Sequence, residues 1–354
     1  MTLDDLVRNP GAWLAAGDLP AVIVSSRVRL ARNLAGVAFP GWAGEDESAR
    51  IQEGLRDVLK RLPSLLPGLT IDMASAGAID RDFLRERHLI SNELAQKSRG
   101  SGLILRADET LSVMVNEEDH LRLQAMRPGL DLANLWTAMD ALDNEIEAQV
   151  RYAYTSDLGY LTACPSNVGT GLRASVMVHL PGLRLTNEIE PIVRGLTKIG
   201  LAVRGLQGEG TEASGNMFQI SNQTTLGESE SAIIERLAQI VNEVAAHEQN
   251  ARLRLMEQRE AQVRDCVGRA YGVLSQARVL TSQEALDYLS GLRLGIELGM
   301  IQGLGMGDVN RLVVYTQPGH LQKVAGRTID PGERDEVRAG MVREQVRRAA
   351  VVED

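Results

Sequence analysis

Apolar and polar positions alternate in several short stretches of the chain, and a period of two is typical of β-strands with one buried face. Residues 21–33 begin as an apolar run and then alternate with arginines, while residues 103–116 contain two alternating arms around a polar turn. Further strands are expected over residues 172–180, 201–205 and 217–221. The pattern therefore predicts one hairpin and several other strands in the first two thirds of the chain.

Elsewhere the apolar positions recur every three or four residues, which is the period of helices packed along one side. After Gly227 this pattern becomes almost continuous, and we place a domain boundary near residue 255, between a first domain of residues 1–255 and a second of residues 256–354. Helices are expected over residues 45–66, 79–88, 130–153, 183–199, 229–270, 282–298, 308–316 and 332–351.

The composition indicates a globular protein with a sizeable core. The 354 residues are 44% hydrophobic and 24% charged, and no apolar run approaches the roughly 18 residues of a membrane span. The N-terminus lacks the basic and apolar regions of a secretion signal. Only Cys164 and Cys266 are present, which argues against disulfides and suits the cytoplasm.

The charge balance excludes some classes of function. A formal net charge of -9 makes general nucleic-acid binding unexpected, because that normally requires a basic face. No His or Cys spacing typical of a metal site is present, so no dedicated protein metal site is predicted. The chain also lacks a P-loop lysine motif and the signature motifs of eukaryotic-type kinases.

Five arginines are candidates for binding phosphate. Arg27 and Arg29 are two positions apart and would project to one face of a strand, while Arg122, Arg173 and Arg204 each lie at the edge of a strand or loop. Guanidinium groups match phosphate oxygens, so such a cage could neutralise a triphosphate without a P-loop. For the first pair, a solvated strand face is the alternative.

Two further segments carry candidate chemistry. Pro165 to Gly171 form a small-residue turn between Cys164 and Arg173, which suits close approach of the backbone to a ligand, although a plain tight turn is the alternative. Residues 117–119 are three adjacent acids, whose mutual repulsion makes a cationic substrate plausible. For Glu117 and Asp119, the favoured alternative is the acidic first turn of a helix.

Four segments, SSRVRLARN, NEEDHLRLQ, CPSNVGTGLRASV and RGLQGEG, resemble the signature blocks of the guanidino (phosphagen) kinases in order and spacing. The resemblance spans about residues 21–225 and implies an α+β fold: an antiparallel sheet flanked by helices, followed here by a smaller all-helical C-terminal domain. It also implies ATP as the phosphate donor. Magnesium would bridge the phosphates mostly through water, which is consistent with the absence of a protein metal cage.

The resemblance also implies roles for individual residues. Glu118 and Glu209 would bracket the guanidinium that receives the phosphate, and Cys164 would lie beside it as the third catalytic residue. From its own pattern, His88 reads as a capping or packing residue, but the resemblance places it by the nucleotide. The implied ATP-binding residues are Ser25, Ser26, Arg27, Val28, Arg29, His88, Arg122, Arg173, Ala174, Ser175, Val176, Met177, Arg204, Gly205, Leu206, Gln207, Gly208 and Glu209.

Two departures from the pattern of the small-metabolite guanidino kinases indicate which branch of the family the chain resembles. Only 24 residues precede Ser25, whereas guanidino kinases of small metabolites resemble one another in having a helical domain there. The added C-terminal segment contains RDEVRA, which is similar to the RDxxRA motif of bacterial protein arginine kinases. By that resemblance Arg334, Asp335, Arg338 and Ala339 would form an allosteric receptor for phosphoarginine. A solvated charged helix is the alternative.

The resemblance therefore implies phosphorylation of arginine side chains in proteins. It further implies a stress response in which marked proteins reach the Clp protease, a zinc-finger activator protein, a homo-oligomer and a cytoplasmic location. One alternative is a kinase of free arginine or another small guanidine. The other is a catalytically inactive adaptor that binds phosphoarginine, for which a lost carboxylate or arginine would be expected.

Overall fold

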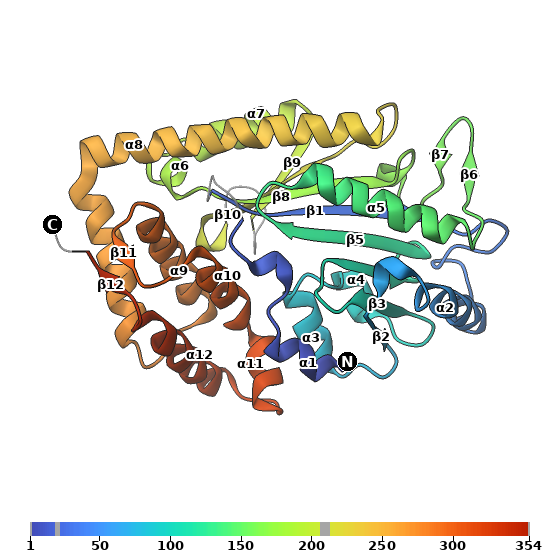
Figure 1. Ribbon diagram of the computed structural model, residues 1–354, viewed down its shortest axis with the longest axis horizontal. Helices are drawn as coiled ribbons and strands as arrows, with labels where there is room; N and C mark the ends of the chain where they lie inside the picture. Colours follow the sequence, from blue (N-terminus) through green and yellow to red (C-terminus); the bar gives the residue numbers. More distant parts are fainter. Residues whose placement is uncertain (1, 18–21, 206–212, 353–354) are drawn as a thin grey trace.

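The computed structural model describes residues 2–17, 22–205 and 213–352, and its centre is an eight-stranded sheet (Figure 1). All neighbouring strands in this sheet pair antiparallel, in the order β2-β3-β4-β5-β1-β8-β10-β9. The predicted fold class is confirmed. The strands are β1 (Ile23–Arg32), β2 (Gly68–Asp72), β3 (Gly102–Arg106), β4 (Leu111–Val115), β5 (Leu121–Pro128), β8 (Leu172–His179), β9 (Leu201–Gly205) and β10 (Met217–Asn222).

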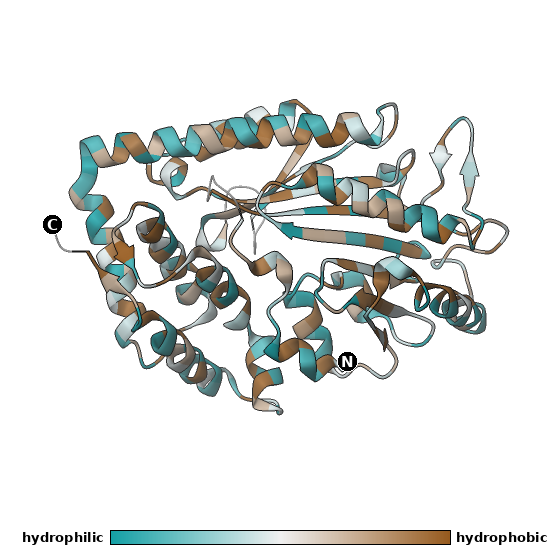
Figure 2. Ribbon diagram, viewed as in Figure 1, coloured by the Kyte–Doolittle hydropathy of each residue, from teal (hydrophilic) through white to brown (hydrophobic). Residues whose placement is uncertain are grey.

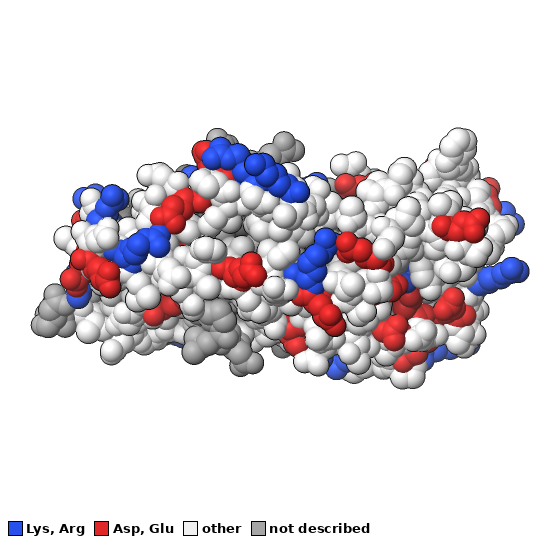
Figure 3. Space-filling view, turned by 90° about the horizontal axis from the view of Figure 1, so that it is seen from above, with Lys and Arg blue, Asp and Glu red and all other residues white. Residues whose placement is uncertain are grey.

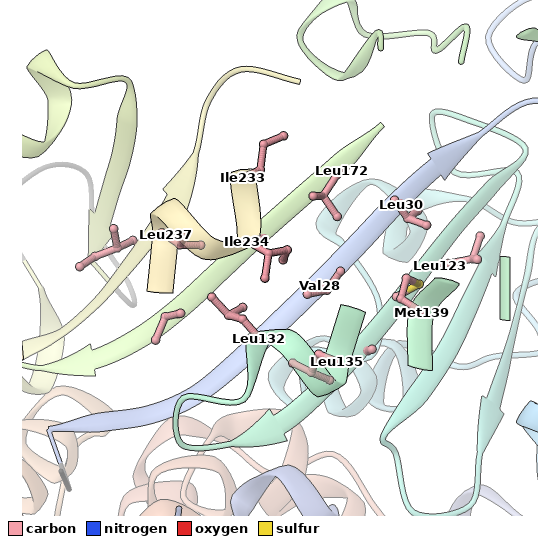
Figure 4. Close-up of a cluster of buried hydrophobic side chains, with 14 of the residues drawn as sticks. Val28, Leu30, Leu123, Leu132, Leu135, Met139, Leu172, Ile233, Ile234 and Leu237 are labelled. Carbon is pink, nitrogen blue, oxygen red and sulfur yellow. The ribbon is translucent and has the colours of Figure 1, made fainter. Parts of the chain in front are cut away.

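One face of the sheet is packed under two helices, α5 (Leu132–Glu147) and α8 (Glu230–Gln276). Val28 and Leu30 of β1 are fully buried there, and Figure 4 shows them among side chains of both helices and of neighbouring strands. Because side chains alternate across a strand, this burial turns Arg27 and Arg29 of β1 to the opposite face. Burying one face therefore sets the orientation of the candidate site.

Helix α8 is the longest element and runs from the sheet into the C-terminal helical part. In Figure 2 hydrophobic and hydrophilic residues alternate around it. Its buried residues up to Ala251 pack on the sheet, and those from Leu255 onward pack in a separate core. At Arg259 the backbone leaves helical geometry, with φ of -144° and ψ of 35°. The boundary near residue 255 stays a prediction.

The C-terminal part is helical, apart from a two-residue pair formed by β11 (Ile301–Gln302) and β12 (Ala350–Val351). Its helices beyond α8 are α9 (Ser282–Glu297), α10 (Met306–Tyr315), α11 (Pro318–Ala325) and α12 (Pro331–Val346). Helix α11 was not expected from the pattern. None of the helices in the described residues has the length and apolar composition needed to span a bilayer.

Several predicted elements need correction. The hairpin over residues 103–116 is confirmed as β3 and β4. The single helix expected over residues 183–199 is two helices, α6 (Pro181–Leu185) and α7 (Ile189–Lys198), because Asn187 lies between them with a left-handed φ of 59°.

Other helices end earlier than predicted. Helix α2 (Glu45–Leu59) stops before Pro63, which begins a short 3-10 turn, since proline cannot continue the hydrogen-bonding pattern of a helix. Helix α5 ends at Glu147, before residue 153. The remaining first-half helices are α1 (Leu3–Arg8), α3 (Ala78–Glu86) and α4 (Asn92–Gln96), and a small hairpin is made by β6 (Tyr154–Thr155) and β7 (Gly159–Tyr160).

A buried ion pair fixes β1 to α5. The Nη2 and Nε atoms of Arg32 lie 2.6 and 3.0 Å from Oδ2 of Asp143, and the Tyr152 hydroxyl donates to the other oxygen at 2.9 Å. The Arg32 guanidinium also lies 3.5 Å from the centre of the Tyr160 ring. The third arginine of the first block is therefore structural, and it does not join the phosphate candidates.

Asp143→Ala should lower the free energy of unfolding by about 3–5 kcal/mol, because it leaves the Arg32 charge buried without its partner. Urea denaturation followed by circular dichroism measures the change. Asp140→Ala removes an exposed acid from the same helix and should have little effect. Equal stability of the two variants would show that the ion pair does not hold β1 to α5.

Candidate active site

Five arginines lie on one face of the sheet because of the strand register. Arg29 of β1 pairs with Arg173 of β8, and Ala31, two residues further along, pairs with Arg122 of β5. Arg27 pairs with Ser175. Gln219 of β10 pairs with Met177 of β8 on one side and with Arg204 of β9 on the other, so Arg204 lies on the same face of the sheet. Strand pairing thus assembles residues separated by up to 177 positions, from Arg27 to Arg204.

These guanidinium groups repel one another. Burial, followed by the charges of Arg122 and Arg173, lowers the pKa of Arg27 to about 10. Burial and then the charges of Arg27, Arg122 and Arg173 also lower the pKa of Arg29 well below its usual value. Burial and then Arg204 and Arg122 also lower the pKa of Arg173. A polyanion placed on this face would relieve the repulsion, which is the electrostatic requirement of a phosphate site.

The cluster also has unused hydrogen-bond donors. Among the described residues, the buried Nε atoms of Arg29 and Arg173 have no hydrogen-bond partner. The Arg27 side chain is positioned by Gln219 of the same sheet, because its Nη2 donates to Oε1 of Gln219 at 2.7 Å. Buried donors without partners are uncommon and costly, so they point to a ligand with acceptor oxygens. The residues therefore fit the triphosphate that the sequence predicts.

A pocket continues from the cluster at Arg27. Its lining includes Ser25, Ser175 and the ring of His88, which faces the ring of Trp13 at 5.6 Å between centroids. Burial and the charges of Arg27 and Arg29 lower the pKa of His88 to about 4, so the imidazole is neutral at neutral pH. A neutral aromatic pocket beside a cationic cluster has the character of a nucleoside site.

A second pocket lies at the turn between β4 and β5 and is lined by Glu117, Glu118 and Cys164. The Glu118 side chain is 45% exposed, and its Oε2 lies 3.9 Å from Nη2 of Arg122. Burial and the neighbouring Glu117 charge raise the pKa of Glu118. Arg122 contacts Glu117, lies near Glu118 and belongs to the arginine cluster, so the acidic pocket and the cluster adjoin there.

Glu117 and Asp119 have structural roles that the sequence pattern did not reveal. The expected first turn of a helix is wrong, because the segment is a tight turn and Leu121 begins β5. Glu117 is fully buried and forms an ion pair with Nη1 of Arg122. Asp119 accepts hydrogen bonds from Nδ2 of Asn33 at 2.5 Å and from the Ala163 amide at 2.6 Å. These acids are bonded to side-chain and backbone donors and do not depend on a helix dipole, although the buried Oδ2 atom of Asp119 has no hydrogen-bond partner among the described residues.

The Asp119 contact places the loop of Cys164 against the acidic turn. Cys164 follows Ala163 directly, is partly exposed, and has its Sγ 3.0 Å from Oγ of Ser166. Gly169 and Gly171 allow the loop to return to the sheet, with φ of 109° and 66°. A Cβ on Gly171 would lie 2.6 Å from the Ala31 carbonyl oxygen, so only glycine fits there.

Part of the predicted nucleotide segment faces away from the cluster. Ser26, Val28, Ala174 and Val176 are buried on the helix-covered side of the sheet, so their side chains cannot contact a ligand on the arginine face. Met177 and Ser25 line the nucleoside pocket, and Gly205 ends β9. Leu206, Gln207, Gly208 and the predicted catalytic Glu209 lie outside the described residues.

The RDxxRA motif lies at the start of α12 and is only partly accessible. Arg338 is 1% exposed and donates to the carbonyl oxygens of Thr316 and Leu280, both at 2.7 Å, and to Asp335. Ala339 is buried. Arg334 and Asp335 are partly exposed. Of the four predicted receptor residues, only Arg334 and Asp335 are therefore accessible from outside, and Arg338 holds the motif in place.

Other residues of the site were missed by sequence reasoning. Trp13 lies far from the predicted blocks, and Gln219 has no motif of its own. The helix turn expected at Glu117 did not predict its burial or its ion pair with Arg122. No group of three or more metal-binding side chains occurs within the described ranges, and in Figure 3 basic and acidic residues are interspersed on the face shown.

Comparison with protein-family models places two adjacent matches on the chain. The model described as ATP:guanido phosphotransferase, C-terminal catalytic domain, matches residues 50–251. The model described as Protein-arginine kinase McsB C-terminal domain matches residues 260–353. Together they span most of the sheet and the C-terminal helices.

Similar proteins extend these matches over the full chain. A relative from Pelotomaculum thermopropionicum, named protein-arginine kinase, is 44% identical over 98% of this chain and 98% of its own length. A second of that name, from Moorella thermoacetica, is 46% identical over 96% of this chain and 98% of its own. Among solved structures, a lombricine kinase superimposes with a TM-score of 0.57 at 26% identity, covering 68% of this chain and 69% of that one.

Arg173→Lys should weaken binding of MgATP by about 1.5–3 kcal/mol, because an ammonium cannot reproduce a two-pronged contact with phosphate oxygens. Isothermal titration calorimetry measures the affinity. Arg127→Lys is the matched control, since this arginine lies on β5 but pairs with Ser26, on the other face of the sheet, and bonds Asp131. Identical affinities in the two variants would remove Arg173 from the phosphate site.

Proposed function

The chain belongs to the protein-arginine kinases of the ATP:guanido phosphotransferase family, and from that premise we propose that it transfers the γ-phosphoryl group of ATP to arginine side chains of proteins with the arginine cluster and Glu118. The observation that carries the proposal is the adjacency of the cationic face and the acidic pocket at Arg122, which contacts Glu117 and lies near Glu118. Donor phosphates and acceptor guanidinium require opposite charges in neighbouring places.

The acceptor must lose a proton during the reaction. A guanidinium has a pKa near 12.5 and a glutamate near 4.3, so complete proton transfer beforehand would cost about 11 kcal/mol. The raised pKa of Glu118 narrows this gap without closing it. Glu118 therefore orients the guanidinium and accepts its proton as the N–P bond forms and the bond to the ADP oxygen breaks.

The other groups support this alignment. Arg27, Arg29 and Arg173 hold the phosphates and stabilise the charge that develops on the transferred group. Magnesium, when bound with the nucleotide, would neutralise part of the negative charge of the phosphate oxygens. We assign Glu209 to the other side of the guanidinium by its position in the RGLQGEG block. Cys164 lies at the same pocket, where a thiolate would add negative charge beside the acceptor.

The accessibility of the pocket favours an arginine that is still part of a polypeptide. Glu118 is 45% exposed at the turn between β4 and β5, so a guanidinium can reach it from outside while its backbone stays at the surface. A free guanidino metabolite is the alternative acceptor. An inactive adaptor is disfavoured because the described arginines and Glu118 are all retained.

Wider roles follow from the family. We propose that the product marks proteins for the Clp protease under stress, that a zinc-finger protein activates the enzyme, and that it acts as a homo-oligomer in the cytoplasm. The supports are the full-length similarity to protein-arginine kinases and the matching C-terminal domain. Pull-down of Clp components with phosphorylated substrate tests the first of these roles.

Incubation of the enzyme with MgATP and an unfolded protein should yield phosphoarginine, detected by mass spectrometry under conditions that preserve the acid-labile bond. Glu118→Ala should lower turnover by about 100-fold or more and leave the affinity for MgATP unchanged, since Glu118 acts on the acceptor. Glu53→Ala removes an exposed acid from α2, outside this pocket, as a control. Near-normal turnover of the Glu118 variant would refute its role, and phosphorylation of free arginine alone would favour the metabolite kinase.

Arg334→Ala should weaken binding of free phosphoarginine by about tenfold, because one charged hydrogen bond to phosphate contributes about 1.5 kcal/mol. Calorimetry measures the affinity, and the same variant is assayed for activity at rising phosphoarginine. Arg347→Ala, an exposed arginine just beyond α12, is the control. Unchanged binding and activity would assign the motif to a solvated, structural helix.

A further inference from the structure

One wall of the nucleoside pocket comes from the C-terminal helical part. Besides His88 and Trp13, the pocket is lined by Asn310, Val313 and Val314 of α10. These residues lie more than 200 positions from His88 in the chain. The phosphotransferase family model ends at residue 251 and the C-terminal model begins at residue 260, so this wall lies in the part of the chain that the C-terminal model matches.

Helix α10 is anchored firmly at this wall. The Asn310 side chain is 4% exposed, its Nδ2 donates to the Ala15 carbonyl at 3.3 Å, and its Oδ1 accepts from Nη1 of Arg293. Arg293 belongs to α9 and is itself buried. The amide therefore connects the N-terminal segment that carries Trp13 to the C-terminal helices. Such a two-sided anchor fixes the position of the wall before a ligand binds.

Neighbouring residues of α10 face different surroundings. Val314 is buried in the cluster that contains Trp13 and Leu14, whereas Val313 is only partly buried and packs beside the C-terminal core. Both line the pocket. Of these two valines, Val313 is therefore the one that retains exposed surface for contact with a ligand.

The rest of the pocket suits a flat aromatic group. Met126, Met177 and Met217 contribute thioethers, which pack well against aromatic faces. Polar groups gather at the end marked by Arg27 and Ser175, where the arginine cluster begins. A nucleotide fits this polarity with its phosphates on the cluster and its base in the apolar pocket.

We propose that α10 is part of the nucleotide site, with Val313 contacting the base or ribose of ATP and Asn310 acting as a positioning residue for that wall. This inference rests on the proposed function, because it takes ATP as the donor. It makes the C-terminal domain a direct determinant of nucleotide affinity.

Val313→Phe, which fills the pocket, should raise the KM for MgATP at least tenfold and change the KM for an unfolded protein substrate less than twofold. Val324→Phe adds the same bulk at an exposed position of α11 and should change neither value. Thermal unfolding of both variants checks that they fold. A KM for MgATP within twofold of the wild-type value in a folded Val313→Phe variant would overturn the inference.

Photolabelling tests the same wall in the unmodified protein. The photoreactive analogue 8-azido-ATP should label residues 306–316, with protection by excess ADP, as found by peptide mass spectrometry. Labelling confined to the sheet and its loops would overturn the inference. If the wild-type enzyme makes no phosphoarginine, the proposed function fails, but MgADP affinity measured by calorimetry in Val313→Phe still decides whether α10 belongs to the site.

Discussion

The mutual repulsion of arginines on one face of a single sheet is the constraint on which the site depends. Arg27, Arg29 and Arg173 are brought together by antiparallel register and would separate if the strands were free to move. The opposite face supplies the opposing free energy, because Val28 and its neighbours are buried under α5 and α8. The hydrophobic core thus holds the arginines close together against their electrostatic repulsion, and a bound polyanion would relieve that repulsion.

The acidic side of the site is organised by buried groups. Glu117 neutralises Arg122 from within the protein, and Asp119 connects the β4–β5 turn to the Cys164 loop through the Ala163 amide. These contacts leave Glu118 at the surface of the pocket. Three consecutive acids therefore have three different roles, and only the central one is free to meet a cation from outside.

The C-terminal helices pack directly against the catalytic face. Glu86 of α3 accepts hydrogen bonds from the Gly319 and His320 amides at the start of α11, at 2.7 and 2.8 Å. Arg338 donates to the carbonyl of Thr316 at the end of α10, and α10 also lines the nucleoside pocket. One helix is thus in contact with both the RDxxRA motif and the lining of the predicted nucleotide site.

The sequence by itself predicted six of the eight strands of the main sheet, most helices, the family and the five candidate arginines, because period-two and period-3.6 patterns and short motifs are local properties of the chain. It did not predict β2 or β5. It misread the acids at 117 and 119, since their partners Arg122, Asn33 and Ala163 are recognisable only after β1, β4 and β5 pair. The tertiary structure alone decided that Arg32 is structural, that Arg338 is buried, and that α10 reaches the pocket of His88. Each of these facts is a contact between distant segments, and side-chain burial depends on what packs over a residue as well as on its own chemistry.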